Sequence, residues 1–476
     1  MVDVPPLPLD RTVAVPLAVQ LADALRAATA SGGLRAGDRL PSTRQLAAEL
    51  GVSRTVTAAA YDQLLAEGWV AGRHGAGTFV VGAPGPAPSA AGPPAPVAPH
   101  DGTQLVSLRA GAPCLEVLDR ASWRRAWRAA GDEPPDREPD PAGTPAYRTA
   151  VAEHLLRHRG LPADGAAVLA TAGTSAAVVE VARLLPPGSR VGVEDPGYGR
   201  AVGALRAAGV HVVPLPVDRD GLVVDAVPRG LAAVYCTPAH QYPLGWRLAA
   251  PRRVALVARA RAEGFWVLED DYDGELRYDV APLPLLAALA PDVVVHLGTT
   301  SKVLSPTLGV GWLVAPPGLR HQLLASRTAT GTRPARAGQR VLAAMAASGD
   351  LARHLRRLRR ELHARRDAVL AAVEAAGHRS EGDAAGAHVV VPLPDLATET
   401  AVLDAARGQG IALDRLSRHL LGHRDAAGVT GLVLGFAAPT RAELTRVLPV
   451  LTELLLRPTD RGAGRAEWRA AGPPDV

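Results

Sequence analysis

Apolar residues recur with two different periods along the chain, and the change between them divides it into two parts. In the first part they return every three or four positions, as on one face of a helix: Leu17, Leu21 and Leu25 precede a glycine pair at positions 32–33. Residues 40–70 predict two more short helices joined at Gly51, and residues 69–81 predict a β-hairpin. This order of elements is typical of a winged helix-turn-helix.

From about residue 165 onward, short apolar runs alternate with helical segments. Several of the runs are continuously apolar, as in strands that are buried on both faces of a mainly parallel sheet. The predicted strands are 167–171, 190–195, 211–217, 232–236, 265–270, 293–298 and 310–314. The expected fold class is a two-domain chain, with an N-terminal winged helix-turn-helix and a C-terminal α/β domain on a mainly parallel central sheet.

A stretch rich in proline, alanine and glycine separates the two parts and predicts a semi-rigid linker. The C-terminal end of the chain predicts a loose tail. We therefore place the boundaries at 12–81 for the winged helix, 82–103 for the linker, 104–456 for the α/β domain and 457–476 for the tail.

Composition narrows the class of protein further. The 476 residues are 47% hydrophobic, which excludes a mostly disordered chain, and carry a formal net charge of +5. Two cysteines cannot build a disulfide framework, and no cysteine or histidine spacing predicts a metal site. The start of the chain is acidic and proline-rich, and no apolar run reaches the roughly 18–20 residues that span a bilayer. We expect a cytoplasmic protein that has no membrane segment.

Lysine occurs once, as Lys302, whereas the other 51 basic residues are arginine. Arginine can replace lysine where only surface charge matters, but a guanidinium stays protonated and cannot act as a nucleophilic amine. The single lysine is therefore a candidate for a reaction that needs an amine. The alternative is that its position is a matter of chance.

The helix-turn-helix pattern predicts contacts with duplex DNA from the first turn of its second helix. The arginine there suits a guanine edge, and the hydroxyls suit bases or phosphates. These candidates are Ser53, Arg54, Thr55 and Thr57, with Arg44 on a phosphate. The alternative is a small protein-interaction domain, since seven arginines in residues 1–80 are balanced by seven acidic residues.

In parallel sheets, ligand-binding groups follow the carboxyl ends of the strands. Lys302 in such a loop suits Schiff-base formation with a cofactor aldehyde, and Asp270 suits the protonated nitrogen of a pyridine ring. Tyr272 suits the phenolic oxygen of that ring, and Tyr198 suits stacking on it. A phosphate needs backbone N–H groups at a helix start together with hydroxyls, for which the candidates are Gly173, Thr174, Ser175, Thr299 and Ser301.

Each of these features has a simpler interpretation. The run EDDYDGE (269–275) is also compatible with a divalent-metal loop or a solvated turn, and Tyr198 with packing alone. His154 and His158 lie one helical turn apart, but a surface helix explains them better than a metal site. His240 either lines the site or bonds to the backbone. No dinucleotide-binding or P-loop glycine pattern occurs.

Residues 34–80 resemble the GntR-type winged helix almost throughout, which adds His74 and Gly75 at the wing to the implied DNA contacts. Behind that domain, EDPGY, TPAHQYPLG, EDDYDGELRY and GTTSKVLSP occur in the order found in the MocR/PdxR regulators. The resemblance implies a fold type I aminotransferase-like domain with a smaller C-terminal α/β subdomain. It implies pyridoxal 5'-phosphate (PLP) as an internal aldimine at Lys302, with Asp270, Tyr272 and Tyr198 around the ring, and a head-to-tail homodimer.

The sequence departs from this family at two points. Gly309 stands where the family usually has an arginine on the PLP phosphate, seven residues after the lysine. Residues 431–439 also lack the arginine that holds a substrate carboxylate in the related enzymes, so that Arg200 is the nearest candidate for an effector carboxylate.

The resulting hypothesis is a PLP-dependent transcriptional regulator that binds operator DNA and senses PLP, an amine or an amino acid through Lys302, without physiological turnover. Two alternatives stay open. One is an aminotransferase that carries a DNA-binding domain, and the other is a regulator whose aminotransferase-like domain is only a dimerisation scaffold.

Overall fold

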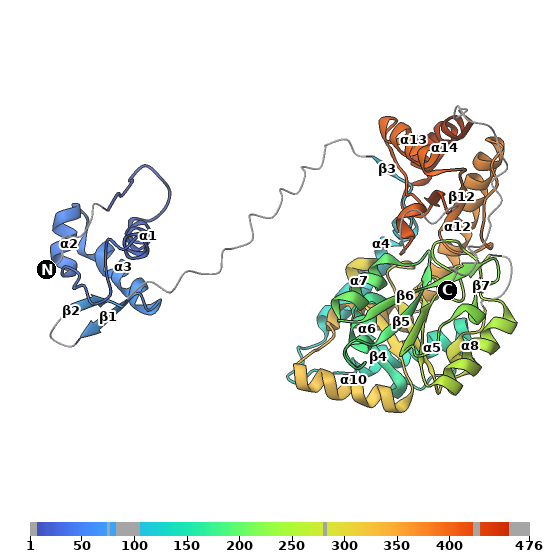
Figure 1. The fold of residues 1–476 in the computed structure, drawn as a ribbon, viewed down its shortest axis with the longest axis horizontal. Helices are drawn as coiled ribbons and strands as arrows, with labels where there is room; N and C mark the ends of the chain where they lie inside the picture. Colours follow the sequence, from blue (N-terminus) through green and yellow to red (C-terminus); the bar gives the residue numbers. More distant parts are fainter. Residues whose placement is uncertain (1–6, 74–76, 82–104, 279–282, 422–428, 457–476) are drawn as a thin grey trace. The chain divides into compact units, whose positions relative to one another are not determined.

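The computed structural model describes residues 7–73, 77–81, 105–278, 283–421 and 429–456, and the chain forms two compact units that divide between His100 and Asp101 (Figure 1). None of the helices in these ranges is long and apolar enough to cross a membrane. The two units are described separately.

The N-terminal unit is a winged helix, as predicted. Its elements are α1 (Leu17–Ala30), α2 (Thr43–Leu50), α3 (Arg54–Ala66), β1 (Val70–Arg73) and β2 (Gly77–Val80). The Oγ atoms of Ser42 and Ser53 accept hydrogen bonds from the N–H groups of Gln45 and Val56, so that each serine caps one helix of the pair. Gly51 has φ of +62°, which allows the sharp turn between α2 and α3.

The second unit contains an eight-stranded sheet in the order β4-β11-β10-β9-β8-β5-β6-β7. The pairs within β10-β9-β8-β5-β6 are parallel, whereas β4, β11 and β7 join antiparallel. The strands are β4 (Val168–Thr171), β5 (Arg190–Asp195), β6 (His211–Asp218), β7 (Gly221–Leu222), β8 (Ala233–Cys236), β9 (Trp266–Asp271), β10 (Val294–Thr299) and β11 (Gly311–Val314). The predicted, mainly parallel sheet is confirmed.

Alternate residues of these strands face two separate hydrophobic clusters, which explains why the strand sequences are continuously apolar. Val267 belongs to one cluster and its neighbour Leu268 to the other. The first cluster includes residues of α4 (Arg120–Asp132), α5 (Pro145–Arg159), α8 (Ala250–Glu263), α9 (Leu286–Leu289) and α11 (Arg336–Ala347). The second includes residues of α6 (Thr174–Ala182), α7 (Gly199–Ala207) and α10 (Pro317–Thr330).

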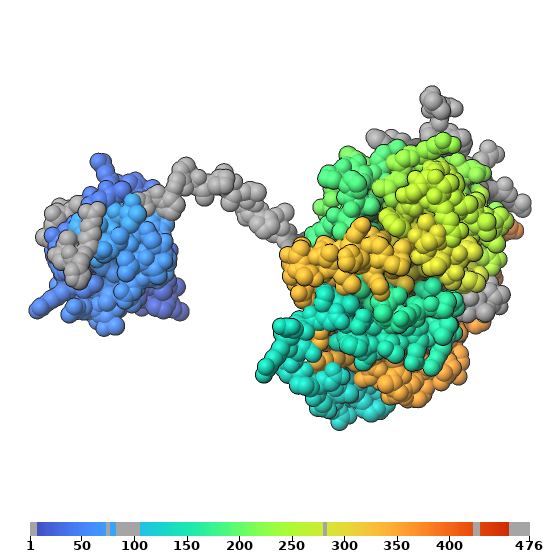
Figure 2. Space-filling view, turned by 90° about the horizontal axis from the view of Figure 1, so that it is seen from below, coloured from blue at the N-terminus to red at the C-terminus, as the bar shows by residue number. Residues whose placement is uncertain are grey.

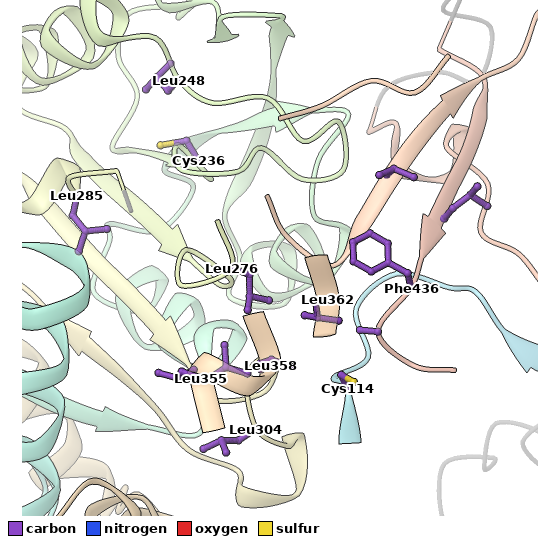
Figure 3. Packing of buried hydrophobic residues seen from close by; sticks show 14 of the residues in the cluster. Cys114, Cys236, Leu248, Leu276, Leu285, Leu304, Leu355, Leu358, Leu362 and Phe436 are labelled. Carbon is purple, nitrogen blue, oxygen red and sulfur yellow. The ribbon is translucent and has the colours of Figure 1, made fainter. Parts of the chain in front are cut away.

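A smaller subdomain contains two short sheets, and a long helix joins it to the large one. In these sheets β12 (His388–Pro392) pairs antiparallel with β14 (Gly431–Gly435), and β3 (Val106–Ser107) pairs parallel with β13 (Ile411–Ala412). Its helices are α13 (Leu396–Gly408) and α14 (Arg441–Leu456), and the joining helix is α12 (Asp350–Ala375). Leu355 and Leu358 of α12 lie beside Leu304, and Leu362 lies toward Phe436 of the smaller subdomain (Figure 3).

Five short 3-10 helices complete the described elements. They are η1 (Leu115–Val117), η2 (Gly165–Ala167), η3 (Val224–Ala226), η4 (Pro306–Leu308) and η5 (Ser417–His419).

Candidate functional site

The acidic run that begins at the end of β9 is buried, and its carboxylates have separate partners. Glu269 accepts hydrogen bonds from backbone N–H groups of α9, and Asp271 forms two hydrogen bonds with Arg159. Asp273 is 2.9 Å from His240, and Glu275 is 2.8 Å from His154. This run is therefore not a solvated turn. No group of three or more candidate metal ligands converges within the described ranges.

Asp270 differs from its neighbours because one of its two oxygens is unused. The hydroxyl of Tyr235 donates to Oδ2 at 2.5 Å, whereas Oδ1 is buried and has no hydrogen-bond partner in the described part of the chain. Burial raises the pKa of Asp270 to about 7, although the Tyr235 hydrogen bond acts in the opposite direction. A buried acceptor without a donor fits the protonated ring nitrogen of a pyridine cofactor.

Lys302 follows β10, whose Leu297 pairs with Asp270 in the parallel neighbour β9. This pairing brings the carboxyl ends of the two strands together. The Nζ atom donates a hydrogen bond of 2.6 Å to the carbonyl oxygen of Gly111. Burial lowers the pKa of Lys302, and the negative charges of Asp273 and Asp270 oppose that shift. A lowered pKa increases the neutral, nucleophilic fraction of the amine at neutral pH.

Tyr198 and Tyr272 lie on either side of a third tyrosine, Tyr242. The ring of Tyr242 makes edge contacts with Tyr198, at 5.6 Å between centroids, and with Tyr272, at 5.9 Å. The Tyr198 hydroxyl is hydrogen-bonded to the side chains of Ser175 and Arg200, and the charge of Asp270 acts on it. The structure thus brings Tyr198, Tyr272, Asp270, Arg200 and Lys302 to one site.

His240, whose role the sequence left open, is buried beside the ring of Tyr272. We call the rings of Tyr198, Tyr242, Tyr272 and His240 the aromatic wall. Its Nδ1 lies 2.9 Å from Asp273 Oδ2 and 2.9 Å from the Tyr272 hydroxyl. Gly386 has to be a glycine for this packing, because a Cβ there would lie 2.1 Å from the imidazole Cε1. His240 therefore orients the hydroxyl of Tyr272.

The residues that the sequence predicts as phosphate ligands lie around the start of α6. Gly173 caps that helix with φ of +120°, and a Cβ on it would lie 3.7 Å from the Oγ1 of Thr299. The Thr299 hydroxyl donates to Ser301 Oγ at 3.0 Å. Backbone N–H groups of Thr174 and Ser175 and nearby hydroxyls suit an anion. Gly309 has φ of +56°, and a Cβ there would meet nothing within 4 Å.

Three residues of the site carried no signal in the sequence. Tyr235 lies in an apolar strand, and Gly111 comes from a loop 191 residues before the lysine. Arg418 in η5 pairs with Asp414 and hydrogen-bonds the Tyr242 hydroxyl. This arginine reaches the aromatic wall from the segment next to β14, where Leu416 N–H donates to the Gly431 carbonyl.

The second site is the exposed face of the winged helix. Ser53, Arg54 and Thr55 are exposed at the start of α3, and Arg44 is exposed on α2. Thr57 is fully buried instead, and its hydroxyl donates to the carbonyl of Thr43 at 2.8 Å. The prediction of a DNA contact for Thr57 is therefore wrong, because the side chain holds α2 against α3. His74 and Gly75 lie outside the described residues.

Family models match both units of the chain. The model for bacterial regulatory proteins of the gntR family matches residues 17–80, and the model for aminotransferase class I and II matches residues 103–448. The HTH-type pyridoxine biosynthesis transcriptional regulator PdxR of Corynebacterium glutamicum is 36% identical over 373 residues, which cover 76% of this chain and 80% of PdxR.

The chain belongs to the MocR/PdxR subfamily of GntR-type transcriptional regulators. A second relative of this subfamily is the probable rhizopine catabolism regulatory protein MocR of Rhizobium meliloti. It is 33% identical over 459 residues, which cover 90% of this chain and 92% of the relative.

Among solved structures, this MocR-type chain resembles aminotransferases. The kynurenine aminotransferase of Pyrococcus horikoshii, whose structure contains PMP, matches with a TM-score of 0.66 at 26% identity, over 74% of this chain and 91% of the enzyme. An archaeal alanine:glyoxylate aminotransferase shares the fold with a TM-score of 0.68 at 24% identity, over 75% of this chain and 90% of the enzyme.

Proposed function

We propose that this MocR-type regulator holds PLP on Lys302 and that the occupancy of this amine controls operator binding by the winged helix. The observation that carries the proposal is the unused buried oxygen of Asp270, which lies on the strand beside the one that leads to the single lysine. A protonated pyridine nitrogen would satisfy that oxygen. When bound, PLP supplies an aldehyde that forms a reversible Schiff base with primary amines.

Each residue of the site then has its own role toward the cofactor. Lys302 Nζ is the nucleophile, and Asp270 holds the proton at the ring nitrogen. Tyr272, oriented by His240, donates toward the ring oxygen, and Tyr198 covers the ring. The phosphate is held by the start of α6 and the adjacent hydroxyls, namely Gly173, Thr174, Ser175, Thr299 and Ser301.

The effector is an amine that competes with Lys302 for the aldehyde, and the charges of the site favour one that also carries a carboxylate. Arg200 acts on both Lys302 and Tyr198, whereas the guanidinium of Arg418 is already paired with Asp414. The guanidinium of Arg200 suits a carboxylate better than a neutral or cationic group. An effector switches the protein only if it binds one arrangement of the dimer better than the other.

Operator DNA is contacted by Arg44, Ser53, Arg54 and Thr55, with His74 and Gly75 added from the sequence alone. The exposed Arg54 at the start of α3 supports this role, since that turn enters the major groove in helix-turn-helix proteins. A homodimer would present two such helices to two half-sites of the operator.

Borohydride reduction of the PLP-loaded full chain, followed by peptide mass mapping, tests the cofactor claim. We expect a pyridoxyl adduct on Lys302 and visible absorbance that Lys302→Ala abolishes. A wild type that stays colourless with added PLP contradicts the proposal. DNA binding that is indifferent to PLP and amines indicates a scaffold, and sustained turnover of an amino acid with a keto acid indicates an aminotransferase.

A further inference from the structure

Two helices of the aminotransferase-like unit carry a cluster of arginines on their solvent side. Arg120, Arg124 and Arg128 are exposed on α4, at a spacing of four residues that places them on one face. Arg356 and Arg360 are exposed and Arg357 is half-buried on α12. We call these six residues the arginine surface.

Contacts between the helix starts hold the first turn of α4 beside the first turn of α12. Ser122 of α4 donates a hydrogen bond of 2.9 Å to Asp350 of α12, and Arg125 lies 3.1 Å from the same carboxylate. The positive charge of Arg357 also acts on Asp119, the residue that caps α4. In the space-filling view the teal and orange segments that contain the two helices meet at the surface (Figure 2).

Asp119 offsets part of the charge of Arg357, but most of the arginine surface is not neutralised by nearby carboxylates in the described part of the chain. Asp350 pairs with Arg125 and Arg353, but none of the six arginines has an ion pair within the described part of the chain. Residues 120–131 and 351–360 contain no acidic residue. Some exposed arginines elsewhere do have carboxylate partners, for example Arg261 with Asp292.

Unpaired like charges one helical turn apart destabilise a helix, so this arrangement favours an external anion. Successive arginines on α4 are about 6 Å apart along the axis, and the three span about 12 Å. Duplex DNA carries roughly seven charges over that length. Guanidinium groups match phosphate oxygens by forming two parallel hydrogen bonds.

We infer that the arginine surface binds the sugar-phosphate backbone of duplex DNA outside the segment that the winged helix reads. The inference rests on the proposed DNA binding of the winged helix, and it assigns part of the affinity, but no base readout, to the aminotransferase-like unit. The phosphate contacts are independent of sequence, so a random duplex is a sufficient probe.

The test measures the anisotropy of a labelled 40-bp random duplex with the full chain over a series of salt concentrations. The variant R120Q/R124Q/R128Q should reduce the slope of log K against log salt by about 2–3, since each phosphate contact contributes about 0.9. The variant R356Q/R360Q, on the other helix, should reduce it by about 1–2. Glutamine keeps the helix propensity of arginine, so both variants should fold.

The matched control R183Q/R206Q/R229Q removes the same charge from three other exposed arginines that also lack an ion pair in the described ranges. Its slope should stay near the wild-type value. Equal slopes for the control and both surface variants overturn the inference. A changed sedimentation coefficient of a surface variant without DNA also overturns it, because the surface would then join two copies of the chain.

Failure of the proposed function gives a different result. If the winged helix makes no phosphate contact, R44Q/R54Q leaves the slope unchanged whatever the surface variants do. If only the arginine surface is wrong, R44Q/R54Q lowers the slope and the surface variants do not.

Discussion

The hydroxyl of Tyr235 donates a hydrogen bond of 2.5 Å to one oxygen of Asp270, and the other oxygen faces no donor among the described residues. The carboxyl is thus fixed in orientation from one side and left open on the other. This hydrogen bond connects β8 with β9, and it leaves Oδ1 of Asp270 able to accept one additional hydrogen bond.

Asp270→Asn should weaken PLP binding by roughly 10- to 150-fold, because a hydrogen bond to a charged group contributes about 1.5–3 kcal/mol. Tyr235→Phe should weaken it by roughly fivefold, since it removes a hydrogen bond of about 1 kcal/mol that only orients the carboxylate. Absorbance titration of the cofactor-free protein measures both. Tyr61→Phe, which removes a buried hydroxyl bonded to Pro41 in the other unit, is the control. Unchanged affinity of Asp270→Asn contradicts the assignment.

The stability of the cofactor-free protein should depend on the protonation of Asp270. Its pKa is about 7 in the folded protein, against 3.8 for an unperturbed aspartate, so the folded state binds more protons between these values. The free energy of unfolding therefore falls as the pH rises from about 4 to 7. Glu194 and Glu269, also near 7, add to this slope.

Asp270→Asn removes one of the three contributions. Urea unfolding without PLP should therefore show Asp270→Asn gaining stability relative to wild type between pH 5 and pH 8. A difference that does not change with pH would show that the carboxyl is already ionised in the folded protein at pH 5.

Gly309→Arg should strengthen PLP binding by about tenfold, by supplying a charge-assisted contact to the phosphate. A side chain has room there, and the adjacent Val310 carbonyl accepts a hydrogen bond from the hydroxyl of Thr300, next to Thr299. The left-handed φ costs about 1–2 kcal/mol of stability for any side chain. Gly309→Ala separates that strain from the effect of the guanidinium. Equal PLP affinity of the two variants excludes a phosphate contact from this position.

Arg54 and Thr57 should respond differently, although they lie only three positions apart. Arg54→Ala should lower the affinity and the salt slope of DNA binding. Thr57→Val removes the buried hydroxyl that bonds to the carbonyls of Thr43 and Arg54, and should cost about 1 kcal/mol of stability without changing the salt slope. Anisotropy at a temperature where both variants are folded, together with thermal melting, compares them. A reduced slope for Thr57→Val would falsify the assignment of Thr57 to packing.

Much of the candidate cofactor site follows from one rule, that parallel strands end at the same edge of a sheet. Asp270 and Lys302 are predictable because each closes or follows a buried strand, and the sheet order then places these strands side by side. Tyr235 is not predictable in this way. It lies inside an apolar strand, and its role depends on β8 being the neighbour of β9, which is a non-local pairing.

In the winged helix, too, the sequence pattern does not predict every contact, although the residues concerned are close together in the chain. The first turn of α3 is predictable from its capping serine, but the periodicity does not say which hydroxyl of that turn faces inward. Thr57 faces α2 because the turn at Gly51 packs the two helices against each other. Arg418 is also beyond sequence reasoning, since only the pairing around β14 brings η5 to the aromatic wall.

The hydrogen bond between Lys302 and Gly111 links the segment after the linker directly to the amine. Gly111 lies shortly after β3, the strand with which the described part of the aminotransferase-like unit begins. A molecule that takes up the amine frees the Gly111 carbonyl from its donor. Under the proposed function, loading of the lysine would therefore change a backbone hydrogen bond close to the point where the chain enters this unit.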